Sequence, residues 1–237
     1  MSRGVDVDAI CVSPPLEPEE LGAAATEILT SAGFAPLVSI DEVHLDTMLE
    51  WCVPGERCIA ATESFAVEGG DAWQVLYDTQ FSHAAFADAL TKAFPERLIL
   101  QFNLQEEVDL TLRVLQRDST LYEFSNAPGF FNWGRCIAQK EIPALARVDV
   151  PALVEALDRK VGAARVAECF DVISAKTLGE RTRPKGKHTG GVYDAMQSLA
   201  GEMGLPRLYR FFEGWMKSDL DWDEDNVAKV LAFRKSS

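Results

Sequence analysis

The chain has 237 residues, of which 47% are hydrophobic, and its formal net charge at pH 7 is −14. This length and apolar content suffice for one large domain or two small ones with a packed core. No segment approaches about 18 consecutive apolar residues, and the chain does not begin with a basic stretch followed by an apolar one. We therefore expect neither a transmembrane helix nor an export signal.

In chain order, apolar periodicity predicts strands at residues 5–12, 36–40, 57–67 and 72–77, and helices at residues 17–33, 42–52 and 82–94. Pro18 suits a first helical turn and the carboxylates beside it complement the helix dipole. Gly33 is a suitable stop for that helix, Ser82 a suitable cap for the third, and Pro95 ends the third. Residues 68–71 (EGGD) predict a hairpin turn.

The clearest periodicity lies between Arg97 and Gly134. Apolar residues alternate with polar ones around Phe102, around Leu112 and again before Phe124, which predicts three adjacent strands, each with one buried face. The following stretch, SNAPGFFNWG, is a turn-rich loop with three aromatic residues. Such a loop either folds back onto the core or contacts a partner.

Helical periodicity prevails after Asp149, with helices predicted at residues 150–157, 161–178, 192–203 and 205–216, and a last helix that Asp221 or Asp223 caps and that runs through Phe233. The predicted fold class is therefore α+β. We expect a mixed or antiparallel sheet with flanking helices in residues 1–140 and an all-helical part in residues 141–237, packed as one domain or as two.

The negative charge is concentrated in the N-terminal half. Residues 1–128 hold 22 acidic and 6 basic residues, a net charge of −16, whereas residues 129–237 hold 15 and 17, a net of +2. Such a field repels nucleic acid and anionic membranes and attracts a basic partner. The alternative interpretation is that acidity only keeps the protein soluble.

Cysteine usage indicates a cytoplasmic protein, because five cysteines are scattered without a CxxC pair. Zinc would require His44, Cys52, Cys58 and a distant fourth ligand to converge, and no standard ligand spacing is present. We expect no metal and no cofactor.

The basic segment 181–188 (RTRPKGKH) could hold an anion, but it lacks the spacing of a phosphate loop, and a solvated loop between helices explains it as well. The acidic segment 219–226 (DLDWDEDN) fails the calcium-loop pattern, because Glu224 and Val230 replace the required glycine and glutamate. Capping of a helix explains these carboxylates, and contact with a basic partner is the alternative.

Catalytic patterns are poorly matched. Asp158-Arg159-Lys160 has the letters of a nuclease motif but lies at a helix end, and Ser82-His83 are sequence neighbours that cannot aim at one point. A triad of Cys136, His188 and Asp171 depends on docking that the sequence does not determine. We therefore expect a protein that is not an enzyme.

A stoichiometric binder is the function that these patterns favour. The candidate partner-binding residues are acidic or aromatic: Glu106, Glu107, Asp109, Asp118, Phe130, Phe131, Trp133, Asp219, Asp221 and Asp223. Their charge would accelerate capture of a basic protein, and buried aromatic residues would slow its release.

In size, acidity, reduced cysteines and α+β pattern without a catalytic set, the sequence resembles the immunity proteins that bacteria carry against their own secreted polymorphic toxins. It is similar in particular to the larger immunity families paired with restriction-endonuclease-like toxins. The resemblance covers the whole chain in character and transfers no binding residues. It implies a cognate toxin, a cytoplasmic location and no enzymatic activity.

Two other functions stay open. One is an enzyme for a small or nucleotide-like substrate that uses residues 181–188 as an anion clamp, which predicts a deep pocket beside that segment. The other is a structural or regulatory module of a larger assembly, which predicts a large exposed apolar patch.

Overall fold

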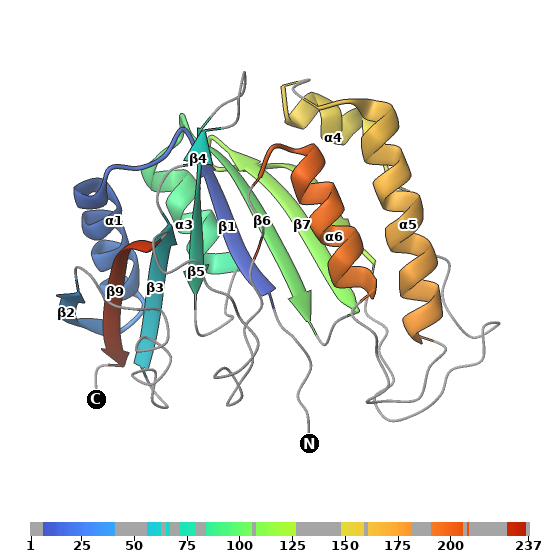
Figure 1. Cartoon of the computed structure of the whole chain (residues 1–237). Coiled ribbons are helices and arrows are strands. Elements are labelled where there is room, and N and C mark those ends of the chain that lie inside the picture. The colour runs from blue at the N-terminus through green and yellow to red at the C-terminus, as the bar shows by residue number, and fades with distance from the viewer. Residues whose placement is uncertain are drawn as a thin grey trace. The chain divides into compact units, whose positions relative to one another are not determined.

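The computed structural model describes residues 7–40, 56–62, 65–66, 72–78, 84–105, 108–126, 148–158, 161–181, 191–205, 208 and 227–235. The fold is α+β, as the sequence predicts, with an antiparallel sheet and its helices first and helices in the C-terminal part (Figure 1). Contacts divide the chain into two compact units. The sheet unit comprises Asp8–Leu100, Leu115–Ser119 and Glu213–Ser237, and the helical unit comprises Met1–Val7, Gln101–Val114 and Thr120–Phe212.

The sheet unit contains six strands and two helices among its described residues: β1 (Val7–Ser13), α1 (Pro18–Ser31), β2 (Phe34–Ile40), β3 (Glu56–Thr62), β4 (Phe65–Ala66), β5 (Ala72–Asp78), α3 (Ala84–Ala93) and β9 (Val227–Lys235). The strand order is β2-β9-β3-β5-β1, and β4 adds to β5. The pairs β1–β5, β2–β9, β3–β5 and β3–β9 are all antiparallel. The last strand in sequence therefore lies in the interior of the sheet.

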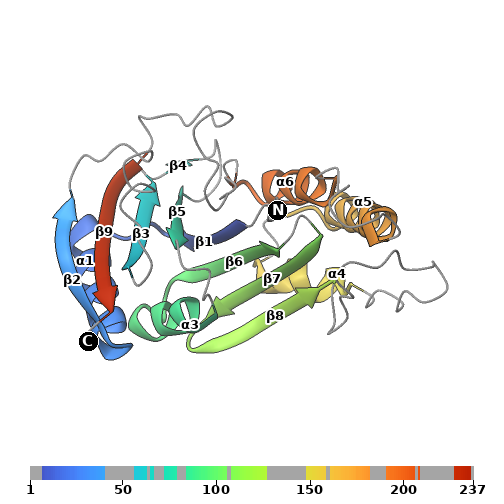
Figure 2. The ribbon, with the colours of Figure 1, turned by 90° about the horizontal axis from the view of Figure 1, so that it is seen from below.

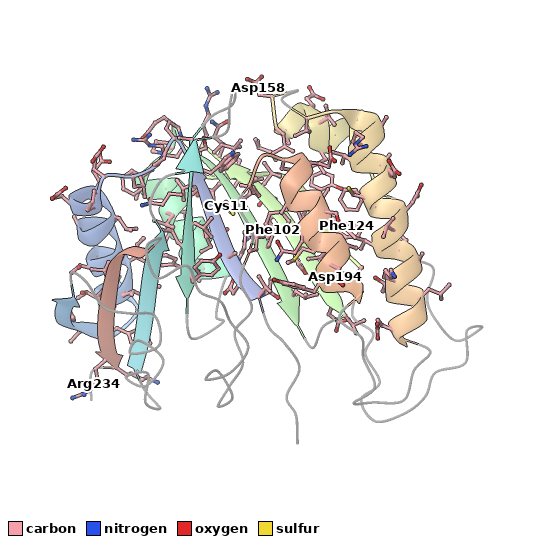
Figure 3. All side chains as sticks on the ribbon, viewed as in Figure 1. Cys11, Phe102, Phe124, Asp158, Asp194 and Arg234 are labelled. Atoms are coloured by element: carbon pink, nitrogen blue, oxygen red, sulfur yellow. The ribbon has the colours of Figure 1, made fainter. Side chains whose placement is uncertain are left out.

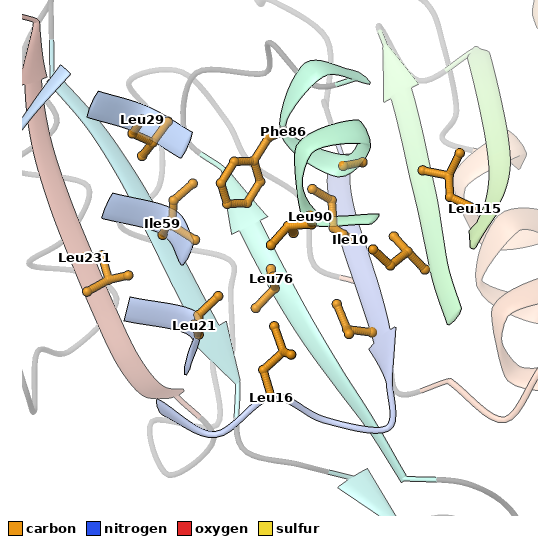
Figure 4. Close-up of a cluster of buried hydrophobic side chains, with 14 of the residues drawn as sticks. Ile10, Leu16, Leu21, Leu29, Ile59, Leu76, Phe86, Leu90, Leu115 and Leu231 are labelled. Carbon is orange, nitrogen blue, oxygen red and sulfur yellow. The ribbon is translucent and has the colours of Figure 1, made fainter. Parts of the chain in front are cut away.

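The core of the sheet unit forms where α1 and α3 cover the same face of its strands (Figure 2). Each helix contributes residues from one face, namely Leu21 and Leu29, eight residues apart on α1, and Phe86 and Leu90, four apart on α3, and all four are at most 2% exposed. They pack with strand residues that include Ile10, Ile59, Leu76 and Leu231 (Figure 4). Burial of these apolar side chains is the main stabilising contribution to this unit.

Helix α1 begins as its sequence predicts. Glu17 is the N-cap, and it forms a capping box with Glu20, whose Oε2 accepts a hydrogen bond from the Glu17 backbone nitrogen at 3.1 Å. Pro18 occupies the first turn, where its missing N–H costs no intrahelical bond. Gly33 follows the helix with φ of 84°, a conformation that favours glycine.

The helical unit contains α4 (Val150–Ala156), α5 (Ala163–Arg181) and α6 (Gly191–Glu202), together with most of β6 (Leu98–Gln105), β7 (Asp109–Gln116) and β8 (Ser119–Ser125). Strand β7 pairs with β6 on one side and β8 on the other. Asp149 caps α4 by accepting a hydrogen bond from the Ala152 backbone nitrogen at 3.0 Å. Helices α5 and α6 run side by side (Figure 1).

Two contacts attach β8 to α5. Phe124 and Phe170 meet edge to face with their ring centroids 4.9 Å apart, and Figure 3 shows where Phe124 lies. Asn126 is fully buried just after β8 and donates a hydrogen bond to Thr177 of α5 at 2.8 Å. The strands thus supply one wall of the core on which α5 packs.

The prediction of a last helix through Phe233 is wrong, because residues 227–235 form strand β9. Leu231 and Phe233 are buried, whereas Arg234 and Lys235 are exposed. The apolar residues of this short segment fit both helical and strand periods, and pairing with β2 and β3 determines the outcome. The C-terminal part is therefore not all helical.

The other predicted strands and helices are confirmed where the structure describes them, with two exceptions. Residues 57–67 form two strands, β3 and β4, rather than one, and Leu205 and Leu208 of the helix predicted at 205–216 are not helical. Several predictions lie outside the described residues, namely the helix at 42–52, the turn at 68–71, the Ser82 cap, most of the helix at 205–216 and the boundary at residue 140. Within the described part of the chain, no helix combines the length and apolar character needed to cross a membrane.

Candidate partner-binding surface

Of the ten predicted partner-binding residues, the structure describes two, Asp109 and Asp118. The others lie outside the described residues: Glu106, Glu107, Phe130, Phe131, Trp133, Asp219, Asp221 and Asp223. Asp109 is half-buried at the first residue of β7, and Asp118 is exposed in the turn after the last. The two carboxylates are thus separated by the length of the strand and do not form one patch.

Asp118 lies at the tip of the β7–β8 hairpin. The tip consists of Arg117 and Asp118, with φ of 53° and 56°. Two successive residues with positive φ produce the turn whose twist suits a two-residue hairpin, and aspartate tolerates this conformation better than most residues. The turn therefore presents the Asp118 side chain to solvent.

Backbone contacts attach the hairpin tip to the segment that follows α3. The Arg117 backbone nitrogen donates to the Pro95 carbonyl at 3.2 Å, and Gln116 Nε2 donates to the Glu96 carbonyl at 3.3 Å. Lys92 Nζ of α3 lies 3.7 Å from Asp118 Oδ1. The tip of the hairpin and the C-terminal end of α3 therefore form one continuous region of the sheet unit.

Arg97 extends this region to the first turn of α1. Its Nη2 lies 3.9 Å from Glu20 Oε2, and its Nε lies 3.3 Å from Glu96 Oε1. The Arg97 side chain is 18% exposed, whereas the Glu20 and Glu96 side chains are 46% and 63% exposed. A largely covered guanidinium thus lies between two carboxylates that face solvent.

We call the exposed carboxylates of α1, of the segment after α3 and of the hairpin tip the acidic surface. Its members are Glu17, Glu19, Glu20, Glu27, Glu96 and Asp118, and the cations among them are Lys92, Arg97 and Arg117. Six negative and three positive charges leave −3. Two further exposed cations of this unit, Arg234 and Lys235, lie at the end of β9, opposite Ala35 and Phe34 of β2.

The ion pairs of the acidic surface contribute little to stability, because exposed pairs are screened by water and salt. No ion pair joins Glu19 or Glu27 to another described residue, and α1 itself contains no lysine or arginine. Among the described residues, these two carboxylates therefore act as unpaired negative charge on the exposed side of the helix. This arrangement attracts a cationic protein surface.

Sequence reasoning missed most of the acidic surface because it assigned Glu17, Glu19 and Glu20 to the start of a helix, where they complement the helix dipole. Capping accounts for Glu17 and Glu20, which form the capping box, but it does not account for Glu27, two turns further on. The available signal was a 14-residue helix with three glutamates and no basic residue. Proximity of Glu96 and Asp118 to α1 depends on Arg97 and on the hairpin, which no local pattern reveals.

Few of the residues considered as metal ligands or catalytic groups lie in the described part of the chain. No group of three or more metal-ligating side chains occurs among the described residues. Asp158 is exposed just beyond α4 (Figure 3), and Asp171 is exposed on α5. The basic segment is described only at Arg181, the last residue of α5, and Cys136 and His188 lie outside the described residues.

Three titratable groups, two in the helical unit and one in the sheet unit, have pKa shifts with identifiable structural causes. Burial, together with the nearby Asp149 carboxylate, raises the pKa of Tyr122 to about 12. A hydrogen bond of 2.7 Å from Arg165 lowers the pKa of Glu202, and this pair joins the first turn of α5 to the last residue of α6. Burial raises the pKa of Cys11 above its usual range, which makes this thiol unreactive.

Comparisons of the sequence with known protein families and characterised proteins, and of the fold with solved structures, found no match.

Proposed function

We propose that this protein is an acidic immunity-type inhibitor, which binds a cognate basic toxin and neutralises it in the cytoplasm of the bacterial cell that produces it. A nuclease is the class of toxin whose chemistry fits this charge best. The observation that supports the proposal is the acidic surface of the sheet unit, within an N-terminal half of net charge −16.

The charge distribution favours a protein partner over a nucleic acid. A surface of net negative charge repels phosphates, and it raises the local concentration of a positively charged protein. The carboxylates of Glu19 and Glu27 form no ion pair with a described residue, so a partner's lysine or arginine can approach them without displacing such a pair. This charge supports capture of a basic protein at α1.

A nuclease needs a cationic cleft to hold the phosphates of its substrate. Arginine side chains bind carboxylates and phosphates with the same forked geometry. A protein that presents carboxylates to that cleft competes directly with the nucleic acid. Inhibition by charge mimicry thus requires no catalytic group in the inhibitor.

The first experiment is a pull-down with the tagged full-length protein from a lysate of its native organism, at low and at moderate salt, followed by mass spectrometry. The proposal predicts recovery of one basic protein at one-to-one stoichiometry, and expression of that protein alone should kill the host. Recovery of a basic protein that is harmless alone and whose activity is unaffected by this chain would contradict it.

The second experiment tests the acidic surface with the recovered partner. Glu19→Lys combined with Glu27→Lys should slow association by roughly tenfold at low salt, because electrostatic steering contributes factors of that order or more. The dependence of the association rate on salt should also become shallower. Surface plasmon resonance over a range of salt concentrations measures both quantities.

A matched control carries the same charge change elsewhere. Glu155→Lys combined with Asp171→Lys alters two exposed carboxylates of the helical unit. This control should retain the association rate of the unmodified protein within about threefold, since its two carboxylates do not belong to the acidic surface. An equal loss in both variants would show that only total charge matters and would remove the acidic surface from the proposal.

A further inference from the structure

Strand β8 is an end strand and belongs to the helical unit. Among the described strands it is hydrogen-bonded to β7 alone. Its side chains alternate: Tyr122 and Phe124 are buried, whereas Leu121 and Glu123 are exposed. Leu121 is 44% exposed, and only it and Val172, at 42%, are large apolar side chains so exposed among the described residues. The end strand thus combines an exposed leucine with a side of the ladder that pairs with no other described strand.

Strand β2, at one end of the strand order of the sheet unit, has features that protect an edge strand from pairing. Strand β2 contains Pro36, which has no N–H to donate, and its ladder with β9 is interrupted between Pro36 and Val38. Proline and irregular pairing are devices that keep an edge strand from accepting another strand. Strand β8, with the sequence STLYEFS, contains no proline, no glycine and no lysine.

The sequence of β8 is complementary to itself in an antiparallel arrangement. When two copies pair with Leu121 opposite Leu121, Ser119 of each copy lies opposite Glu123 of the other. This register brings the two exposed leucines together and places a hydroxyl donor opposite each carboxylate. A register centred on Glu123 would place two carboxylates side by side, which is unfavourable.

We propose that β8 pairs with β8 of a second copy of this chain, antiparallel and with Leu121 at the twofold axis. The interface is isologous, so each copy uses the same residues. In this register residues 119–123 of each copy face one another, so five residues on each side make a small interface, and the dimer is therefore in equilibrium with the monomer. This self-association is independent of the toxin partner proposed above, and either proposal can fail without the other.

Disulfide cross-linking of the full-length protein tests the register. Oxidation of the Leu121→Cys variant should produce a covalent dimer, because directly opposite residues have Cβ atoms about 4.5–5.5 Å apart. In the Glu123→Cys variant the two cysteines lie four residues apart along the strands, about 13 Å, and should not join. Ser119→Cys mixed with Glu123→Cys should give the cross-linked heterodimer. The unmodified protein, with its five natural cysteines, sets the background.

Analytical ultracentrifugation tests the association without cross-linking. The mean mass of the unmodified protein should rise towards twice the chain mass between about 10 μM and about 1 mM, a range suited to a weak interface. Leu121→Glu should abolish this rise, whereas Val172→Glu, which adds the same charge at the other exposed apolar residue, should leave it unchanged. Both sites are exposed, so neither change should affect folding.

Two outcomes would overturn the proposal. One is a monomer mass at every concentration together with no cross-link in Leu121→Cys above the background. The other is equal cross-linking of Leu121→Cys and Glu123→Cys, which would show contact without the proposed register.

Discussion

Asn126 and Thr177 are 51 residues apart in sequence, yet the side-chain amide of the asparagine donates a hydrogen bond to the threonine hydroxyl at 2.8 Å. The same amide also donates to the Val108 carbonyl at 2.8 Å, and its oxygen accepts from the Leu110 backbone nitrogen at 2.7 Å. The threonine hydroxyl in turn donates a hydrogen bond to the Ile173 carbonyl within α5 at 2.8 Å. One buried polar side chain thereby joins the β7–β8 hairpin to a helix.

Replacement of Asn126 by alanine should destabilise the protein by about 3 kcal/mol, because it leaves the Val108 carbonyl and the Leu110 nitrogen buried without these partners. Thr177→Val keeps the shape and removes the two hydrogen bonds of the hydroxyl, so we expect a loss of about 1–2 kcal/mol. Urea denaturation measures both free energies of unfolding. Equal values for the two variants would contradict a network centred on Asn126.

The raised pKa of Tyr122 predicts a loss of stability in alkali. The phenol ionises near pH 10 in the unfolded chain and at about 12 in the folded protein. Between these values the unfolded state releases a proton that the folded state retains, so the contribution is complete below pH 10 and declines as pH rises towards 12. In Tyr122→Phe this contribution is absent.

The difference in urea midpoint between the unmodified protein and Tyr122→Phe isolates this effect from the other titrating groups. This difference should be constant up to about pH 9. From about pH 10 upward, the urea midpoint of the unmodified protein should fall relative to that of Tyr122→Phe. A difference that stays constant up to about pH 11.5 would show that Tyr122 ionises equally in both states.

Substitutions at two adjacent residues of β9 should have very different effects on stability. Phe233 is 1% exposed and belongs to the core of the sheet unit, so Phe233→Ala should cost about 3–5 kcal/mol. Arg234 is exposed, so Arg234→Ala should change stability by less than about 0.5 kcal/mol. Thermal unfolding followed by circular dichroism distinguishes the two. Similar melting temperatures would be incompatible with an interior strand at this position.

Replacement of two glycines by alanine should change the stability of the protein in opposite directions. Gly33 has φ of 84°, so Gly33→Ala should destabilise the protein by about 1–2 kcal/mol. Gly201 lies in α6, and a Cβ added there meets no atom within 4 Å, so Gly201→Ala should stabilise it by about 0.5–1 kcal/mol. Denaturant midpoints provide the comparison. Stabilisation by Gly33→Ala would contradict the left-handed conformation after α1.

Local patterns in the sequence predict much of this fold. Alternation places Leu110, Leu112 and Val114 on buried positions of β7, and all three are fully buried. Pro18 and the carboxylates beside it locate the start of α1, and helical periodicity after Asp149 locates α4. These features depend on neighbours in sequence, so a single chain is sufficient to recognise them.

Features that depend on distant segments could not be predicted in this way. Strand β9 fits two periods equally, and only its pairing with β2 and β3 resolves the ambiguity. The acidic surface requires Arg97 to lie beside Glu20, and the Asn126 network requires α5 to pack against the hairpin. None of these contacts leaves a periodic signal in the sequence.

The position of β9 between β2 and β3 also has a consequence for protein synthesis. The ribosome makes β2 and β3 long before β9, and until residue 235 has left the exit tunnel these two strands lack the partner that joins them. Their hydrogen-bonding edges are exposed during that interval, and exposed edges recruit strands from other nascent chains. Completion of the sheet therefore waits for residues 227–235, and chains that stop before β9 is made are candidates for chaperone binding and proteolysis.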